Sequence, residues 1–357
     1  MITGPRSAVT SAGNGSSPRR PRILGRRAGE RALARPTSTS FGERAATWGP
    51  LAALVAMCVA FSIFADRFAS VDNFQAILDS SAVLAVITVG LTFVLLLGAI
   101  DLSVEGVMAT CGLGFSLLVL NNRNGWDLGL VAVIPIVVLG AGFGFTSGTL
   151  SSRLKVPSFM TTVGMSAIGV GIATLLFGGL QPNILDPALG RWTSGRWFGF
   201  TPLTFVAAGC VVIGALIQRH TRLGRYAMAI GSAEDIVALS GVNVSRYKGY
   251  AFALAGAFYG LGAVMMTTQL QAGVVEAPNG LNFTAITAAV VGGTLLSGGQ
   301  GGVLQSAVGV LIVKVLENGL VLLDVSPYLQ RAVQGVVVVA AVAAATWPLR
   351  ARLRVVK

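Results

Sequence analysis

The stretch Gly98–Gly106, GAIDLSVEG, interrupts an apolar run from Ala82 to Leu120 and decides how this part of the chain folds. Asp101 and Glu105 are the only ionisable residues in the run. As one helix the run would be about 58 Å long at ~1.5 Å per residue, whereas the hydrocarbon core of a bilayer is about 30 Å thick. A charge at bilayer depth costs on the order of 2.5–3.5 kcal/mol unless it meets a pore, a partner or water. We therefore expect the helix to break here and both acids to have a partner or a task.

Composition places the chain in a membrane. Of its 357 residues, 54% are hydrophobic and 11% are charged, whereas roughly 25% of the residues of a soluble domain are charged. In lipid the backbone polar groups need internal partners, which a helix supplies. The sequence therefore predicts an all-α, polytopic membrane protein with about ten transmembrane helices. The ten apolar segments are residues 48–65, 82–98, 104–120, 128–150, 158–180, 200–217, 249–269, 284–296, 303–323 and 329–347.

Basic residues gather on one predicted side of the membrane. With both termini in the cytoplasm, twenty Lys and Arg residues lie on that side, in tails 1–47 and 348–357 and in loops 151–157 and 218–248. Four lie outside, so the positive-inside rule favours this orientation. We predict a transmembrane domain over 48–347, preceded by a disordered tail. The net charge of +12 does not indicate nucleic-acid binding, because no aromatic residues interleave with the terminal charges.

The residues alone leave two roles open for Asp101. It lines a solute path with Ser103 and Glu105, or its carboxylate caps the helix that starts near Ser103. A similar choice stands at Gly292–Gly302, GGTLLSGGQGG. This stretch is a tight hairpin between short spans, or its bare backbone admits a neighbour or a solute. The sequence has no G-x-x-x-x-G-K-S/T motif, so neither stretch is a nucleotide-binding loop.

The two stretches also resemble each other. Residues 94–114, VLLLGAIDLSVEGVMATCGLG, and 289–309, AVVGGTLLSGGQGGVLQSAVG, both run from apolar to Gly- and Ser-rich and back to small and apolar. Two pseudo-symmetric halves built on this plan would fit a transporter with repeats around a central path. The alternative is that Gly-rich hairpins share this composition without any repeat.

The basic loop 218–248 contains a short capped helix. Ser232 and Asp235 form an S-x-x-D capping box, and Gly241 is placed to stop the helix. Glu234 and Asp235 in its first turn suit the helix dipole. The helix carries three apolar side chains, Ile236, Val237 and Leu239. It is either a surface helix on the membrane or a docking helix for a cytoplasmic partner.

Several other patterns predict packing rather than chemistry. Glycines at four-residue spacing mark close helix contacts; they are Gly140, Gly144 and Gly148, and Gly256 and Gly260. Lys314 and Glu317 are three residues apart and are expected to form an ion pair, with a proton relay as the alternative. One histidine and three cysteines in apolar runs offer no metal site and no nucleophile–base pair, which argues against an enzyme.

Together these motifs resemble the permease subunits of ABC importers for monosaccharides, the ribose, xylose, arabinose and galactose group. The match runs from about Asn73 to Ala345. The family's Gly-Gly-Ile-Asp-Leu-Ser-Val-Gly stands here as GAIDLSVE, at Gly98–Glu105. The other matching stretches are Lys155–Phe159, Thr221–Gly231 with Leu239–Val242, Gly292–Thr294 with Leu296–Gly299, and Asn318–Leu320.

The resemblance implies a multi-pass permease subunit in the plasma (inner) membrane of a bacterium, moving a monosaccharide or a related polyol. Its implied partners are a cytoplasmic ABC ATPase, an extracytoplasmic sugar-binding protein and a second permease subunit in a homodimer. This chain then holds no cofactor, and ATP with Mg²⁺ is bound by the ATPase. The implied ATPase-coupling residues are Ser232, Glu234, Asp235, Ile236, Leu239, Ser240 and Gly241. The candidate substrate-path residues are Asp101, Ser103, Glu105, Asn282, Thr284 and Thr294.

The chain departs from the family's pattern at two candidate path positions. Glu105 stands where Gly is usual, and Asn282-Phe283-Thr284 stands where an acidic residue is usual. Two alternatives stay open. One is an ion-coupled secondary transporter that uses Asp101, Glu105 and the Lys314/Glu317 pair. The other is an ABC permease for another small solute, such as a branched-chain amino acid or a nucleoside.

Overall fold

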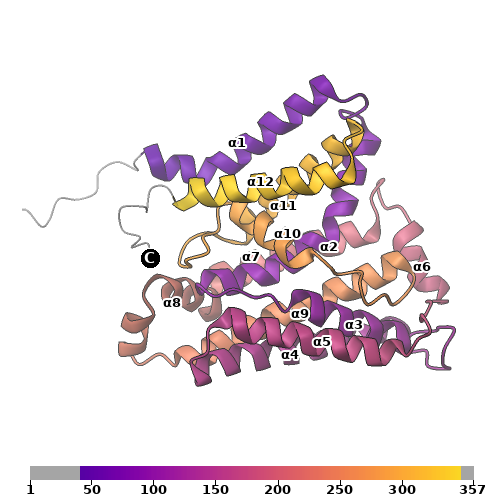
Figure 1. The fold of residues 1–357 in the computed structure, drawn as a ribbon, viewed down its shortest axis with the longest axis horizontal. Helices are drawn as coiled ribbons and strands as arrows, with labels where there is room; N and C mark the ends of the chain where they lie inside the picture. The colour runs from indigo at the N-terminus through magenta and orange to yellow at the C-terminus, as the bar shows by residue number, and fades with distance from the viewer. Residues whose placement is uncertain (1–40, 347–357) are drawn as a thin grey trace, which may run out of the picture. The chain divides into compact units, whose positions relative to one another are not determined.

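All regular secondary structure in the described residues, 41–346 of this computed structural model, is helical (Figure 1). The predicted tails 1–47 and 348–357 lie outside these residues, apart from 41–47 at the start of α1. The helices are α1 (Phe41–Phe64), α2 (Val71–Leu96), α3 (Val104–Leu118), the 3-10 helix η1 (Gly129–Ala132), α4 (Val133–Leu154), α5 (Ser158–Phe177), α6 (Pro187–Ser194), α7 (Pro202–His220), α8 (Arg222–Leu239), α9 (Val244–Leu270), α10 (Leu281–Val291), α11 (Val303–Leu322) and α12 (Pro327–Thr346).

Each of the ten predicted apolar segments corresponds to a helix, so the all-α, polytopic prediction is confirmed. Within residues 41–346, six helical stretches are long and apolar enough to cross a membrane: 71–96, 129–154, 158–177, 202–220, 244–270 and 303–322. α3 and α10, with 15 and 11 residues, are shorter. At ~1.5 Å per residue, α10 covers about 16 Å, roughly half of the hydrocarbon core. Both short helices adjoin the glycine-rich stretches, so they are short because the chain breaks there.

The sequence prediction placed the start of α2 too late and did not include α6. α2 begins at Val71, eleven residues before the predicted start, because Ser70 caps it by accepting a hydrogen bond from the Asn73 N–H. α6 was not predicted, although Asp186 followed by Pro187 is a recognisable helix start, and the Asp186 side chain accepts from the Ala188 N–H. In both cases polar residues at the cap carry a signal that hydropathy does not.

α2 and α9 form the core, and α4 packs against α9 through glycines. Most of the largest fully buried side chains belong to α2, α3 and α9, whereas α4 and α5 carry many exposed apolar side chains, as lipid-facing helices do. Figure 1 shows α4, α5 and α9 running alongside one another. A Cβ at Gly144 would meet the Phe252 carbonyl, and one at Gly256 would meet the Gly140 carbonyl. The predicted close helix contact is therefore confirmed, and it joins α4 to α9.

Candidate functional site

The predicted break at GAIDLSVEG is confirmed, and it has a defined geometry. Gly98 has φ +73°, and its N–H donates to the Leu95 carbonyl at 2.9 Å. The Ala99 N–H donates to the Val94 carbonyl at 3.3 Å. These two bonds cap the C-terminal end of α2, with Gly98 in the left-handed backbone conformation. From there the chain runs without helix to Ser103, and α3 begins at Val104.

Side chains from other helices satisfy the backbone of this non-helical segment. Ser158 of α5 accepts a hydrogen bond from the Ile100 N–H, and Thr162 accepts one from the Leu102 N–H, each at 3.0 Å. The Asn282 amide of α10 donates to the Leu102 carbonyl at 3.2 Å. Irregular backbone within a membrane domain requires partners of this kind.

Asp101 is fully buried and ties the break to the core. Its Oδ1 accepts hydrogen bonds from the Ser103 N–H at 2.9 Å and the Ser103 hydroxyl at 2.6 Å. Its Oδ2 accepts one from the Tyr259 hydroxyl of α9 at 3.0 Å. Asp101 and Ser103 are both 0% exposed. Of the two roles left open by the sequence, this geometry matches the one in which Asp101 holds the start of α3.

Glu105 and Asn282 join the starts of α3 and α10, although they lie far apart in sequence. The Glu105 carboxylate accepts from the Gly280 N–H at 2.9 Å. The Asn282 side-chain oxygen accepts from the Glu105 N–H at 3.3 Å. Each side chain therefore accepts a hydrogen bond from a backbone N–H at the start of the other helix, where N–H groups lack helical partners.

A cavity of about 530 Å³ opens beside this junction, between α10, α11 and α12. Thr284 is the candidate path residue that lines it, together with Asn279 and Thr287, which sequence reasoning missed. Thr284 and Thr287 are three residues apart, so they share a helix face, and this spacing was readable in advance. The volume falls in the range of small-molecule sites, about 300–1,000 Å³.

The second glycine-rich stretch, Gly292–Gly302, forms a hairpin, one of the two alternatives left open by the sequence, and it repeats the first turn. The Gly293 N–H donates to the Val290 carbonyl and the Thr294 N–H to the Ala289 carbonyl, both at 2.9 Å. These bonds match those at Gly98 and Ala99 in pattern, and Gly293, like Gly98, has a positive φ of +103°. The resemblance between residues 94–114 and 289–309 in sequence therefore extends to the backbone geometry of the two turns.

Thr294 lies inside this hairpin and does not line the cavity. It is 0% exposed, its hydroxyl lies 3.0 Å from the Ser306 hydroxyl, and it accepts a hydrogen bond from the Gly302 N–H at 3.2 Å. Thr92 of α2 donates to the same Ser306 hydroxyl at 2.8 Å. The hairpin is thereby held against α2 and α11.

α8 differs from the predicted coupling helix at its start. It begins at Arg222, and Ala233 alone departs from helical geometry, with φ −162° and ψ 77°. The predicted Ser232 cap is wrong, because Ser232 already ends the first half of α8 and its hydroxyl donates to the Met228 carbonyl at 2.9 Å. The predicted stop is confirmed, since Gly241 has φ +80° and its N–H donates to the Ala238 carbonyl at 3.0 Å.

The second half of α8 presents apolar side chains outward. Ile236 is 67% exposed and Leu239 is 89% exposed. Glu234 forms an ion pair with Lys248 of α9 at 2.7 Å, which holds this half at the start of α9. Asp235 and Ser240 are also exposed. This exposure fits both alternatives left open by the sequence, a helix on the membrane surface and a docking helix for a partner.

The two interruptions of the helical run are called breaks: the first runs from Leu96, the last residue of α2, to Ser103, and the second is Gly292–Gly302. The first half of α8 touches both of them through Gly231. A Cβ at Gly231 would meet the Leu96 carbonyl, and one at Gly298 would lie 3.0 Å from the Gly231 Cα. The Gly299 N–H also donates to the Leu96 carbonyl at 2.9 Å. The end of α2, the second break and α8 therefore meet at one point, with no side chain between them.

Gln218, at the end of α7, holds the second break in the same region. Its amide donates to the Gly301 carbonyl at 3.2 Å, and its side-chain oxygen accepts from the Val303 N–H at 2.8 Å. Sequence reasoning missed Gln218 and Gly231, because nothing local to either residue points to a partner some 70 or more positions away.

Comparison with known proteins identifies the family. The model of the family described as "Branched-chain amino acid transport system / permease component" matches residues 73–342. The chain belongs to this permease family. The ribose import permease protein RbsC of Escherichia coli is 34% identical over 297 residues, covering 82% of this chain and 91% of that protein. The L-arabinose transport system permease protein AraH of Escherichia coli is 28% identical over 306 residues, covering 86% and 92%.

A third relative, the ribose import permease protein RbsC of Bacillus subtilis, is 32% identical over 297 residues, covering 82% of this chain and 91% of that protein. No solved structure matches the chain. The family and the apolar helices together make the chain a multi-pass inner-membrane permease component, which is a transport protein and not an enzyme. The resemblance to ABC import permeases drawn from GAIDLSVE and its companion motifs is confirmed.

Proposed function

We propose that this chain is the membrane-spanning subunit of an ATP-driven ABC importer that carries a monosaccharide or a related polyol. The relatives named for ribose and arabinose import support this class of solute. An extracytoplasmic binding protein delivers the solute and selects it. Two copies of the chain form a homodimer in this proposal, and the solute passes between them.

The single observation that carries the proposal is the contact of α8 with both breaks. The half of α8 after Ala233 exposes Ile236 and Leu239, and the half before it touches Leu96 and Gly298 through Gly231. A partner that grips the exposed half can therefore displace the two breaks together. In this proposal the partner is a cytoplasmic ATPase that binds ATP with Mg²⁺, and the permease family supports such a partner.

The proposed orientation places both termini, α8 and the start of α9 in the cytoplasm. The excess of Lys and Arg in the tails and in loops 151–157 and 218–248 supports it. The exposed α8 residues then face the cytosol, where an ATPase is available. The binding protein docks on the opposite side.

The candidate residues divide into two roles in this proposal. Thr284, with Asn279 and Thr287, lines the cavity and faces the solute. Asp101, Ser103, Glu105, Asn282 and Thr294 are positioning residues that hold the breaks. The ATPase-coupling residues are Glu234, Asp235, Ile236, Leu239 and Ser240, with Ser232 and Gly241 at the ends of that half-helix.

One alternative solute has an observation in its favour. The family description names branched-chain amino acids, so an amino acid delivered by another binding protein competes with the sugar. An ion-coupled transporter is disfavoured, because Asp101 is enclosed by hydrogen bonds and Lys314 pairs with Glu317 at 2.7 Å.

The test uses liposomes that hold the chain together with a candidate ABC ATPase and a candidate sugar-binding protein from the same organism. We expect sugar uptake that requires ATP on the cytoplasmic side, and loss of ATPase binding in Ile236→Asp/Leu239→Asp. The conservative variant Leu239→Met serves as the control and is expected to bind the ATPase normally. Uptake by the chain alone on an ion gradient would refute the proposal, and a binding protein that takes only branched-chain amino acids would refute the solute.

A further inference from the structure

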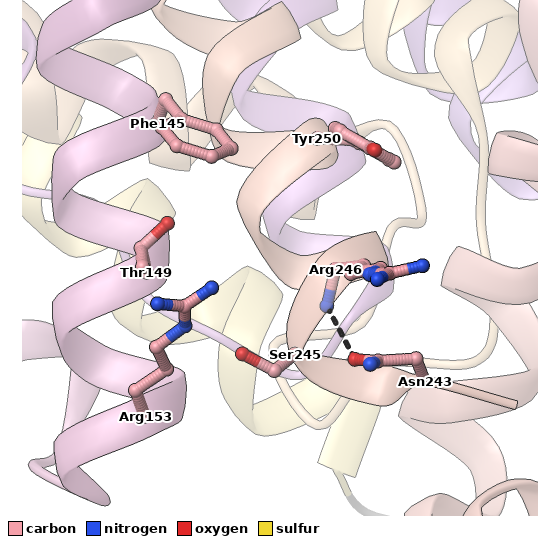
Figure 2. Close-up of a pocket in the computed structure, with 7 residues that line it drawn as sticks. All are labelled: Phe145, Thr149, Arg153, Asn243, Ser245, Arg246 and Tyr250. Carbon is pink, nitrogen blue, oxygen red and sulfur yellow. Dashed lines mark hydrogen bonds between the residues drawn. The ribbon is translucent and has the colours of Figure 1, made fainter.

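We propose that a groove between the end of α4 and the start of α9 binds the phosphate-bearing headgroup of an anionic phospholipid in the cytoplasmic leaflet. The groove has a volume of about 350 Å³ and is lined by residues of both helices (Figure 2). The inference rests on the orientation proposed above and does not depend on the transported solute.

Two arginines give the groove its charge. Arg153 comes from the last turn of α4 and Arg246 from the first turn of α9, and both are exposed. Figure 2 shows the Arg153 side chain in the space between the two helices, whereas the Arg246 side chain extends from α9 on the side away from α4. Among the side chains that the structure describes, no carboxylate lies within ion-pair distance of either guanidinium. Glu234, the acid of the neighbouring helix, pairs with Lys248 instead.

The remaining polar groups suit a phosphate. Thr149 and Ser245 bring hydroxyl groups to the groove from opposite helices. α9 begins here, and Asn243 caps it by accepting from the Arg246 N–H at 3.0 Å. Guanidinium groups bind phosphate oxygens through paired hydrogen bonds, and the N-terminal end of a long helix adds a favourable dipole.

An apolar track continues from the groove along α4, and this track favours a lipid over a soluble phosphate compound. Ile134, Val138 and Phe145 are exposed and follow one another at spacings of four and seven, so they share a face with Thr149 and Arg153. From Ile134 to Arg153 the track is about 28 Å long at ~1.5 Å per residue, close to the thickness of the hydrocarbon core. An acyl chain can lie along it while the headgroup meets the arginines.

Aromatic side chains mark the boundary between the two parts. Phe145 is 44% exposed and Tyr250 is 53% exposed, and both line the groove. Tyrosine is enriched where headgroups meet acyl chains. Gly249 leaves room beneath them, since a Cβ there would lie 3.3 Å from the Phe145 ring and the Thr149 hydroxyl. Basic pockets between membrane helices on the cytoplasmic side are known headgroup sites, which fits this combination.

The test measures lipid binding by the full-length purified chain, without ATPase, binding protein or sugar. The chain is placed in phosphatidylcholine nanodiscs with and without phosphatidylglycerol, and bound lipid is measured by native mass spectrometry. The test variant is Arg153→Gln/Arg246→Gln. The control is Arg219→Gln/Arg222→Gln, which removes the same charge from exposed arginines on the same proposed side.

We expect phosphatidylglycerol to be retained by the wild type and by the control. The test variant, which loses both guanidinium groups, should bind it about a hundredfold more weakly, because each charge-assisted contact is worth about tenfold. Equal weakening in both variants would show diffuse surface attraction and overturn the proposal. If the wild type bound soluble glycerol phosphate as tightly as phosphatidylglycerol, the lipid assignment would be overturned. If the test variant bound lipid normally but no longer bound the ATPase in lipid-free detergent, the groove would belong to the ATPase interface and the proposal would be wrong.

Discussion

The two breaks share one turn but are anchored in different ways. The first, after α2, is held by Asp101, whose carboxylate reaches Ser103 and Tyr259 of the core helix α9. The second, after α10, is held by Gln218 and by close contact with Gly231, which belong to α7 and α8. The first break is therefore bonded to the core helix α9, and the second is bonded to α7 and in contact with α8, which also reaches the end of α2 at Leu96. We infer that the second break follows α8 when a partner moves it.

The largest effect is expected from removing the anchor of the first break. Asp101→Ala leaves the Ser103 N–H and the Tyr259 hydroxyl buried without their acceptor, at a cost of about 1–3 kcal/mol each. Uptake should be abolished while the protein still inserts in the membrane. Asp127→Ala, which removes an exposed carboxylate, is the control and should transport normally. Normal uptake in Asp101→Ala would show that transport does not require the Asp101 anchor.

A large but partial effect is expected at the anchor of the second break. Gln218→Ala removes both hydrogen bonds to the hairpin, and Gln218→Glu keeps the acceptor for Val303 but loses the donor to Gly301. Each bond is worth about 1 kcal/mol, so uptake should fall by about thirtyfold in the alanine variant and about fivefold in the glutamate variant. Wild-type uptake in Gln218→Glu would show that the bond donated to Gly301 does not hold the loop.

A smaller effect is expected where the starts of α3 and α10 meet. Glu105→Ala leaves the Gly280 N–H without its acceptor, whereas Glu105→Gln retains an acceptor oxygen. We expect the alanine variant to lower the free energy of unfolding by about 1 kcal/mol and the glutamine variant to lie near wild type. Thermal unfolding in detergent measures both. Equal losses would mean that the charge, and not the hydrogen bond, matters.

The smallest effect contrasts two threonines one turn apart on α2. The Thr88 hydroxyl is buried and has no hydrogen-bond partner among the described residues, whereas the Thr92 hydroxyl bonds to Ser306 beside the second break. Thr88→Val should leave the free energy of unfolding unchanged or raise it slightly, and Thr92→Val should lower it by about 1 kcal/mol. A larger loss from Thr88→Val would reveal a partner for its hydroxyl.

The sequence predicted the features that depend on local chemistry. The break at Asp101, the hairpin at Gly292–Gly302, the stop at Gly241 and the Lys314/Glu317 pair follow from hydropathy, glycine and short spacing. The cap at Ser232 failed because the preceding residues are themselves helical, so the hydroxyl turned back to Met228.

What the sequence could not predict depends on contacts between distant segments. Gly98, Gly231 and Gly298 lie close together in the fold, but no short stretch of sequence predicts this contact. In the sequence, a glycine needed for close packing cannot be told from one needed for a turn. The partners of Asp101 and Gln218 are of the same kind. The junction that links α8 to both breaks is therefore visible only in the fold.

The central claim is that motion of α8 reaches the breaks through Gly231. The measurement is the amount of sugar carried per ATP hydrolysed by liposomes that contain the chain, its ATPase and its binding protein. Gly231→Ala is compared with Gly164→Ala, whose Cβ would meet nothing within 4 Å. The expected result is continued hydrolysis with a severalfold lower yield of sugar in Gly231→Ala and a wild-type yield in Gly164→Ala. A wild-type yield in Gly231→Ala would contradict the account.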